Sequence, residues 1–109
     1  MPRQVAVIGL GNFGAQLAAE LTRRGAEVLA IDERAEAVDD VREHVTHTVR
    51  LDATDPKALA EQRISDMDAV VVSFGSDFEA ALLTVSVLKQ LGVRRLIVRA
   101  TTVRHERIL

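Results

Sequence analysis

The residues best suited to chemistry in this chain are three glycines near its start. Gly9, Gly11 and Gly14 have the spacing G-x-G-x-x-G, which can hold a phosphate group. They follow an apolar run over residues 5–8, and Asp32 comes eighteen positions after Gly14, at the end of the next apolar run. The glycine spacing alone is a weak signal. Strand, glycine turn, helix and downstream acid within one βαβ-length unit together predict a dinucleotide-binding site.

Each glycine has its own mechanical role in that prediction. Gly9 allows a tight turn out of the strand, because a side chain would resist the dihedral angles required. Gly11 lets the backbone come close to a phosphate, and Gly14 lets the following helix pack tightly on the strand. The N-terminus of that helix would then present free N–H groups and a partial positive charge to the phosphates. The alternative is a glycine turn that only packs a helix on a sheet.

Asp32 is placed to accept hydrogen bonds from both hydroxyls of an adenosine ribose. A 2′-phosphate would sit against its negative charge. The sequence therefore disfavours a ligand of the NADP type.

The elements that must position these residues alternate along the chain between strand-like and helix-like periods. The expected strands cover residues 3–8, 27–31, 46–51, 69–72 and 96–98. The expected helices are one with a Phe13, Leu17 and Leu21 stripe that stops at Gly25, a short one around 36–43, one starting at Asp55-Pro56, and the longest over 77–91. This alternation predicts an α/β fold: a Rossmann-like, doubly wound parallel sheet in the order 3-2-1-4-5, within three layers.

In such a sheet a ligand lies beyond the carboxyl ends of the strands, at the switch between the first and fourth strands. Asp52, Ala53 and Thr54 follow the third strand, and Asp52 and Thr54 either face the adenosine or only cap a turn before Asp55. Ser73, Phe74 and Gly75 follow the fourth strand, where Ser73 and Gly75 would line the phosphate side, and Asp77 is expected to cap the long helix. Arg99 closes the fifth strand and is the best cation for a terminal phosphate. Thr101 or Thr102 is expected to cap a last helix.

The 109 residues predict one domain, with 48% hydrophobic and 28% charged residues. No apolar run approaches the about 20 residues of a membrane span, and residues 1–4 lead straight into a strand, so neither direct membrane insertion nor a signal peptide is expected. The net charge of −2 argues against nucleic acid as a partner. The absence of cysteine fits a cytoplasmic location.

The sequence offers no catalytic set for this cleft. It has no Cys and no Tyr, and it lacks the G-x-x-x-x-G-K-[ST] pattern of P-loop hydrolases. His44, His47 and His105 do not fall into a metal-ligand spacing. The sequence therefore predicts nucleotide binding without catalysis or a metal site.

With these residues placed, the chain resembles the RCK family (also called KTN or TrkA-N), the nucleotide-binding domains of potassium-transport regulators such as the cytosolic subunits of Trk/Ktr uptake systems. The resemblance spans nearly the whole chain. Its specific parts are residues 7–14, 30–32, the Asp-Ala-Thr-Asp run at 52–55, residues 71–77, and the tail at 98–100 and 105–109. The run at 52–55 and the tail discriminate most, because ordinary dehydrogenases do not share them.

The resemblance implies that the cleft binds ATP, ADP or NAD(H), and that ligand exchange reshapes a ring of domains that gates a membrane potassium transporter. It places the phosphates at the three glycines, the ribose at Asp32, the adenosine end at 52–54 and the distal phosphate at Arg99. Several ATP-responsive members carry arginine where this chain has Asn12, so ATP, ADP and NAD(H) all stay candidates. The chain is expected to be one domain over 1–109 that stops before the family's C-terminal lobe. The full predicted binding set is Gly9, Leu10, Gly11, Asn12, Phe13, Gly14, Asp32, Glu33, Asp52, Ala53, Thr54, Ser73, Phe74, Gly75 and Arg99.

The long helix predicts self-association independently of the family. At 100° per residue, Leu82 and Leu83 lie on either flank of the arc that would face the sheet. This apolar excess favours a partner helix in a homo-oligomer, or burial under a missing part of the same polypeptide. For the function, the alternative to a potassium-transport regulator is the cofactor domain of an NAD-dependent oxidoreductase.

Overall fold

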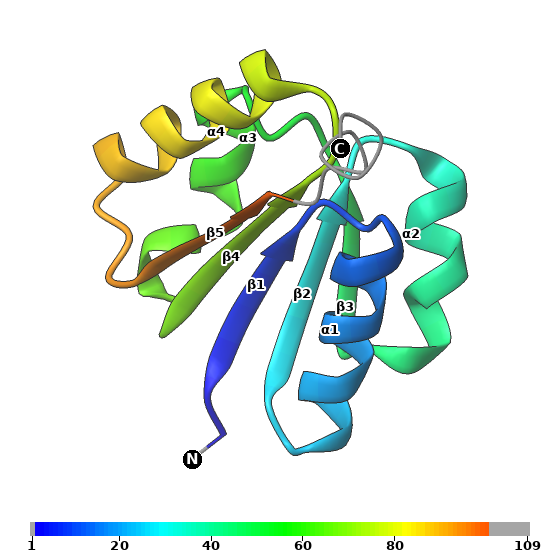
Figure 1. Cartoon of the computed structure of the whole chain (residues 1–109). Helices are drawn as coiled ribbons and strands as arrows, with labels where there is room; N and C mark the ends of the chain where they lie inside the picture. Colours follow the sequence, from blue (N-terminus) through cyan, green and yellow to red (C-terminus); the bar gives the residue numbers. More distant parts are fainter. Residues whose placement is uncertain (1, 101–109) are drawn as a thin grey trace, which may run out of the picture.

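Strands and helices alternate along the chain in the computed structural model, which describes residues 2–100 (Figure 1). The strands are β1 (Gln4–Ile8), β2 (Glu27–Asp32), β3 (His47–Arg50), β4 (Ala69–Phe74) and β5 (Leu96–Ala100). The α-helices are α1 (Asn12–Arg23), α2 (Ala35–Val41), α3 (Pro56–Glu61) and α4 (Phe78–Gln90). Two 3₁₀ turns lie between these elements: η1 (Arg42–His44) connects α2 to β3, and η2 (Ile64–Asp66) connects α3 to β4.

All five strands are parallel and lie in the order β3-β2-β1-β4-β5, which confirms the predicted topology. Val7 in the central strand β1 pairs with Ala30 of β2 on one side and with Val71 of β4 on the other. β2 and β3 therefore extend the sheet on one side of β1, and β4 and β5 extend it on the other. The crevice between these two halves of the sheet opens at the carboxyl ends of β1 and β4, where doubly wound sheets bind ligands.

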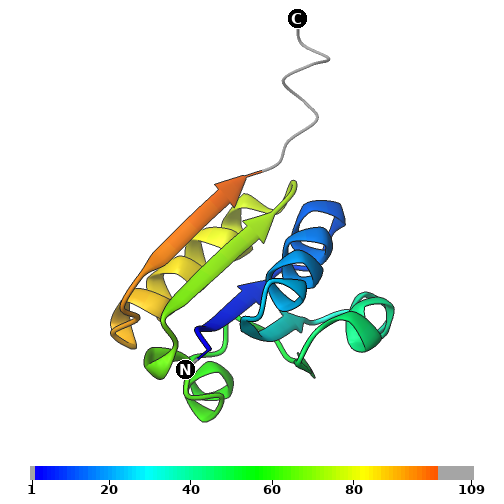
Figure 2. The same cartoon turned by 90° about the horizontal axis from the view of Figure 1, so that it is seen from below.

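The alternation of side chains along each strand divides the core into two layers. One layer joins Val5, Val7, Val28, Ala30 and Val71 of the sheet to buried residues of α1 and α2. The other joins Ala6, Ile8, Leu29, Ile31, Val70 and Val72 to Leu59 of α3 and to Val87 and Leu88 of α4. The view from below shows α1 and α4 on opposite faces of the sheet (Figure 2). Because β1 and β4 are covered on both faces, their residues are apolar in succession, as buried parallel strands require.

The predicted helix caps are confirmed. Asp55 accepts a hydrogen bond from the Lys57 N–H at 3.0 Å and Asp77 accepts one from the Ala80 N–H at 3.0 Å. Each cap satisfies a backbone donor in the first turn of its helix. Asp77 therefore fixes the point at which α4 leaves the carboxyl end of β4.

The differences from the predicted elements lie at their ends. The helix expected over 36–43 is α2 followed by the 3₁₀ turn η1, and β3 is shorter than residues 46–51. β4 and β5 each extend two residues beyond the predicted ends, and η2 was not predicted. Thr101 and Thr102 lie outside the described residues. Within residues 2–100, no helix has the length and apolarity needed to cross a membrane.

Candidate functional site

A cleft of about 540 Å³ lies at the carboxyl ends of β1 to β4, within the size range of small-molecule sites. Its walls are the turn after β1, the segments that follow β2, β3 and β4, and the first two turns of α4. Eleven of the predicted site residues line it: Gly9, Leu10, Gly11, Asp32, Glu33, Asp52, Ala53, Thr54, Ser73, Phe74 and Gly75. Asn12, Phe13, Gly14 and Arg99 do not.

Gly9 and Gly14 are required by the packing of the protein itself. Gly9 has φ +95°, and a β-carbon on it would lie 1.9 Å from the carbonyl oxygen of Ser73 in β4. A β-carbon on Gly14 would lie 1.9 Å from the carbonyl oxygen of Gly9. These overlaps involve backbone atoms, so no side-chain rotation relieves them. The structure therefore confirms that these two glycines serve the turn and the close approach of α1.

Gly11 differs from both, because no heavy atom of another segment lies within 4 Å of a β-carbon built on it. It is the N-cap of α1 with ordinary dihedral angles, φ −72° and ψ −165°. Its carbonyl accepts the Ala15 N–H at 2.9 Å. The protein alone has room for a side chain at this position, which lines the cleft.

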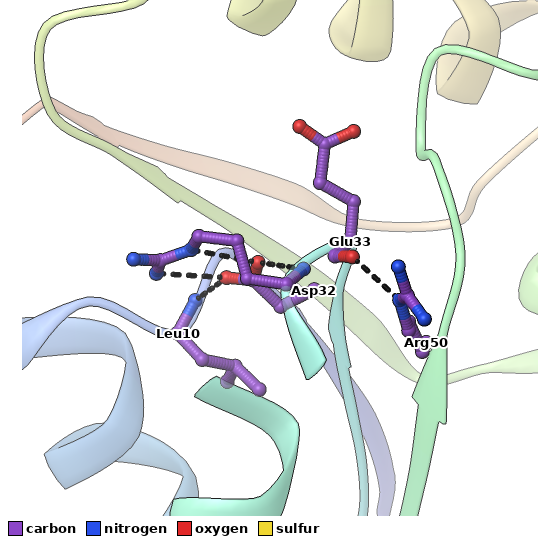
Figure 3. Close-up of polar contacts among 5 residues, drawn as sticks. Leu10, Asp32, Glu33 and Arg50 are labelled. Carbon is purple, nitrogen blue, oxygen red and sulfur yellow. Dashed lines mark hydrogen bonds and ion pairs between the residues drawn. The ribbon is translucent and has the colours of Figure 1, made fainter. Parts of the chain in front are cut away.

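Asp32 ends β2, and its carboxylate receives four hydrogen bonds (Figure 3). The Leu10 N–H donates to Oδ2 at 2.8 Å and the backbone N–H of Arg34 donates to Oδ1 at 2.9 Å. The Arg34 side chain donates from Nε to Oδ1 at 3.2 Å and from Nη2 to Oδ2 at 3.3 Å. Asp32 thus ties the glycine turn after β1 to the segment after β2.

These contacts also set the protonation state of Asp32. Burial, the largest single effect, would raise its pKa, but hydrogen bonds from the Arg34 side chain, the Arg34 backbone and the Leu10 N–H together outweigh it. The pKa of Asp32 therefore lies below its ordinary value, and the hydrogen bonds that Arg34 donates to Asp32 raise the pKa of Arg34. At neutral pH the pair is an anion next to a cation. The Asp32 side chain is 9% exposed and the Arg34 side chain 54% exposed.

Arg50 of β3 lies beside this pair. It is the direct register partner of Asp32 across β2 and β3, and its Nε donates to the Glu33 carbonyl oxygen at 2.9 Å. The Glu33 side chain extends away from the Asp32 carboxylate (Figure 3). Arg34 therefore contacts the acid directly, whereas Arg50 bonds to the backbone of the next residue.

Asp52 and Thr54 form a turn of their own. The Asp52 Oδ1 accepts the Thr54 backbone N–H at 2.9 Å and the Thr54 hydroxyl at 2.7 Å. Hydrogen bonds from the Thr54 side chain and then its backbone N–H lower the pKa of Asp52. The turn-capping interpretation is therefore correct. It does not remove these residues from the cleft, because both line it.

The sequence interpretation missed the residues of the cleft wall opposite the glycine turn. Ser76, Asp77, Ala80, Ala81 and Thr84 line it from the start of α4, and Arg34 lines it after β2. The capping role of Asp77 was the available signal, because a helix that starts at the end of β4 must place its first turns beside the cleft. The small side chains of Ala80 and Ala81 leave space there.

Arg99 and Phe13 contact each other outside the cleft wall. The Arg99 guanidinium lies 4.1 Å from the centroid of the Phe13 ring, a cation–π arrangement between β5 and the start of α1. The role of Arg99 at a distal phosphate stays a prediction. Within residues 2–100, no group of three His, Cys, Asp or Glu side chains could hold a metal ion.

Comparison with known proteins agrees with this geometry. A family model described as the TrkA-N domain matches residues 5–109. The Ktr system potassium uptake protein C of Bacillus subtilis (strain 168) is 36% identical over 109 residues, 100% of this chain and 49% of that protein. The Ktr system potassium uptake protein A of the same organism is 37% identical over 107 residues, 98% of this chain and 48% of that protein. The chain spans about half the length of these relatives.

Among solved structures, the NAD(P)-binding domain of an exopolyphosphatase-related protein from Archaeoglobus fulgidus superposes with a TM-score of 0.78 at 28% identity. The match covers 95% of this chain and 77% of that one. Because the family model covers residues 5–109 of a 109-residue chain, the chain belongs to the TrkA-N domain family of Rossmann-type nucleotide-binding domains.

Proposed function

We propose that this domain is the regulatory adenine-nucleotide sensor of a potassium uptake system. In this proposal it binds ATP, ADP or NAD(H), and the bound nucleotide controls a membrane transporter subunit from the cytoplasmic side. The main support for the proposal is that Gly11 and Asp32 line the same cleft, at the switch between β1 and β4. The potassium uptake function named for the two Bacillus subtilis relatives supplies the biological context.

The proposed ligand lies across the carboxyl ends of the strands. Its phosphates bind at Gly9 and Gly11, next to the N-terminus of α1, where backbone N–H groups and the helix dipole favour an anion. Its ribose lies at Asp32 and its adenine near the Asp52–Thr54 turn. Arg99 approaches a distal phosphate from β5, on the side of Phe13.

The proposal is regulatory because the lining carboxylates Asp32, Asp52 and Asp77 are each held by hydrogen bonds that build the turns and helix caps of the fold. The lining hydroxyls belong to Thr54, Ser73, Ser76 and Thr84, and no cysteine, histidine or lysine lies among the lining residues. A catalytic role would need one of these carboxylates to exchange its structural hydrogen bond for one to a substrate. The second candidate, the cofactor domain of an NAD-dependent oxidoreductase, is favoured by the likeness to an NAD(P)-binding domain.

A further part of the proposal is assembly through α4. Phe78, Leu82 and Leu83 are 60%, 65% and 52% exposed, and all three belong to this helix. Exposed apolar side chains gathered on one helix are typical of an interaction surface. We propose that a second copy of the domain covers them. The remaining half of a protein of the relatives' length is the competing occupant.

Calorimetry of the 109-residue chain with ATP, ADP and NADH tests nucleotide binding. We expect binding of at least one nucleotide, and at least tenfold weaker binding in Asp32→Ala, about 1.4 kcal/mol of lost interaction. Equal affinity in Asp32→Ala with an unchanged circular dichroism spectrum would remove Asp32 from the site. Absence of binding for all three nucleotides would refute the sensor.

The two candidate functions differ in turnover. The sensor predicts neither ATP hydrolysis nor NADH oxidation above a buffer control. Turnover that Asp32→Ala abolishes would contradict the regulatory proposal and favour an enzyme domain.

A further inference from the structure

The cleft is lined by more acidic than basic side chains. Among the described residues that line it, four carry a carboxylate and one carries a guanidinium, namely Asp32, Glu33, Asp52, Asp77 and Arg34. The Arg34 guanidinium donates two hydrogen bonds to Asp32, so its charge balances that of Asp32. The other three carboxylates have no cation among the lining residues to balance them. A cleft lined by one sign of charge focuses the field between its walls, so this cleft disfavours a ligand of high negative charge.

The start of α1 can hold a diphosphate, but it adds no cationic side chain. Gly11 is the N-cap, so no side chain caps the first N–H groups of the helix. Those N–H groups and the helix dipole amount to about half a positive charge. Residues 12–15, which form the first turn, include no lysine, arginine or histidine. Doubly wound sheets bind the pyrophosphate of a dinucleotide at this position.

The arginine that approaches the start of α1 is held outside the cleft. The Arg99 guanidinium lies 4.1 Å from the centroid of the Phe13 ring, and Arg99 does not line the cleft. Its backbone position is fixed by the register of β5, in which it is the partner of Ser73. A third phosphate would therefore gain this cation only if the guanidinium left the face of the aromatic ring, which attracts it.

The wall formed by β4 and α4 offers buried hydroxyl groups, which carry no charge. Ser73 is 7% exposed and Thr84 is 5% exposed, and both line the cleft. Within residues 2–100, neither hydroxyl bonds to another protein group. Thr22 of α1 shows the alternative, because its hydroxyl donates to the Ala18 carbonyl oxygen at 2.9 Å. A hydroxyl both donates and accepts, so Ser73 and Thr84 suit the sugar hydroxyls or the amide of a second nucleoside.

We propose that this cleft selects a dinucleotide, NAD(H), over a nucleoside triphosphate, and that the carboxylates of its lining set this selection. The inference rests on the proposed nucleotide site and names its ligand. NAD(H) carries its phosphate charge in one diphosphate between two nucleosides, and that diphosphate fits the start of α1. ATP carries a free triphosphate, whose additional charge meets Glu33, Asp52 and Asp77 without a cation. Asp32 keeps its place at the adenosine ribose, which both ligands share.

Calorimetry of the 109-residue chain with NADH, ADP-ribose, ADP and ATP measures this selection. EDTA is present, because a divalent cation would mask the charge of the triphosphate. We expect NADH to bind about tenfold more tightly than ATP, the scale that unit charges produce at several ångströms in a partly solvated site. ADP-ribose, in which a sugar caps the diphosphate, should bind more tightly than ADP. Added salt should narrow both differences, because it screens the repulsion.

Two capping aspartates provide a matched pair of variants. Asp77→Asn keeps a competent cap on α4, because asparagine caps helices as well as aspartate does, and it removes one carboxylate from the cleft wall. We expect ATP to bind about three- to tenfold more tightly to it, and NADH to change less. Asp55→Asn makes the same change at the cap of α3, outside the cleft lining, and should keep the wild-type affinity for ATP. Glu33→Gln removes a lining charge after a different strand and should act like Asp77→Asn.

The outcomes separate this inference from the proposed function. ATP binding as tightly as NADH in EDTA overturns the selection and leaves the nucleotide site standing. Loss of that ATP affinity in Arg99→Ala would then identify Arg99 as the cation for a third phosphate. An equal gain of ATP affinity in Asp77→Asn and Asp55→Asn, or no gain in either, overturns the role of the lining carboxylates. Failure of all four nucleotides to bind overturns both proposals together.

Discussion

The carbonyl oxygen of Gly9 lies 1.9 Å from the position that a β-carbon on Gly14 would occupy. The first turn of α1 therefore rests directly on the turn that leaves β1, and no side chain fits between them. Gly14→Ala forces either the turn or the helix to move, which is an overpacking effect. We expect a loss of about 1–3 kcal/mol in the free energy of unfolding, measured by urea denaturation. A wild-type denaturation midpoint in Gly14→Ala would show that the turn yields freely.

Gly11 provides the contrasting substitution in the same turn. A β-carbon on Gly11 has open space around it, and its dihedral angles suit any residue. Gly11→Ala should therefore change the free energy of unfolding by no more than about 1 kcal/mol, the usual scale of an N-cap substitution. Its affinity for nucleotide should nevertheless fall at least tenfold in calorimetry, because the methyl group occupies the approach of the phosphates. Unchanged affinity in a folded Gly11→Ala would mean that the phosphates do not approach this turn.

The pairing of Asp32 with Arg34 predicts a specific pH dependence of stability. The pKa of Asp32 is lowered in the folded protein, so the unfolded chain, with a pKa of about 3.9, binds the proton more readily. The stabilisation by Asp32 is therefore fully present above that unfolded pKa and is lost as the pH falls through the lower folded pKa. In Arg34→Ala the burial and the two backbone hydrogen bonds remain, but the side-chain hydrogen bonds, which lower the pKa most, disappear, so the loss of stability should begin at higher pH.

Urea denaturation of wild type and Arg34→Ala between pH 3 and pH 7 measures this shift. Asp32→Asn serves as the reference without a titrating group, and its deficit relative to wild type should shrink toward low pH. Arg42→Ala should follow the wild-type profile. Superimposed acid profiles for Arg34→Ala and wild type would exclude Arg34 as a determinant of the Asp32 pKa.

A charged substitution in the exposed apolar surface of α4 is expected to change the mass of the assembly and not the folding of the domain. Leu83 is 52% exposed, so Leu83→Glu should leave the circular dichroism spectrum native. If a second copy covers α4, the buried charge has no partner and the variant should show a lower mass by light scattering. Gln16→Glu places the same charge on the exposed side of α1 and should keep the wild-type mass. A wild-type chain that stays monomeric at high concentration would contradict self-association.

Leu88 tests the position of α4 on the sheet. It is fully buried in the layer formed with α3, and Leu88→Ala should cost about 2–5 kcal/mol in the free energy of unfolding. The different outcomes expected for Leu83 and Leu88 follow from their positions on opposite sides of one helix. A small effect of Leu88→Ala on the denaturation midpoint would mean that this layer repacks easily.

The sequence by itself determined the order of elements, the sheet topology and most of the cleft. Apolar periodicity is a local property, so it placed the five strands and the long helix to within a few residues. The glycine spacing predicted the turn after β1, because Gly14 packs against Gly9 only five residues earlier, although Gly9 itself is constrained by Ser73 in β4. The helix caps at Asp55 and Asp77 could also be predicted, since each carboxylate accepts a backbone N–H only two or three residues away.

Only the tertiary structure decided which groups meet inside that frame. The four donors on Asp32 come from two separate turns, and the closeness of Arg50 depends on the register between β2 and β3. Arg99 lies over Phe13 because β5 and α1 are brought together by the sheet order. These contacts depend on strand register, on sheet order and on side-chain conformation. Local periodicity encodes none of the three, so an acid read from the sequence as a free ribose acceptor is, in the folded domain, already bound to an arginine.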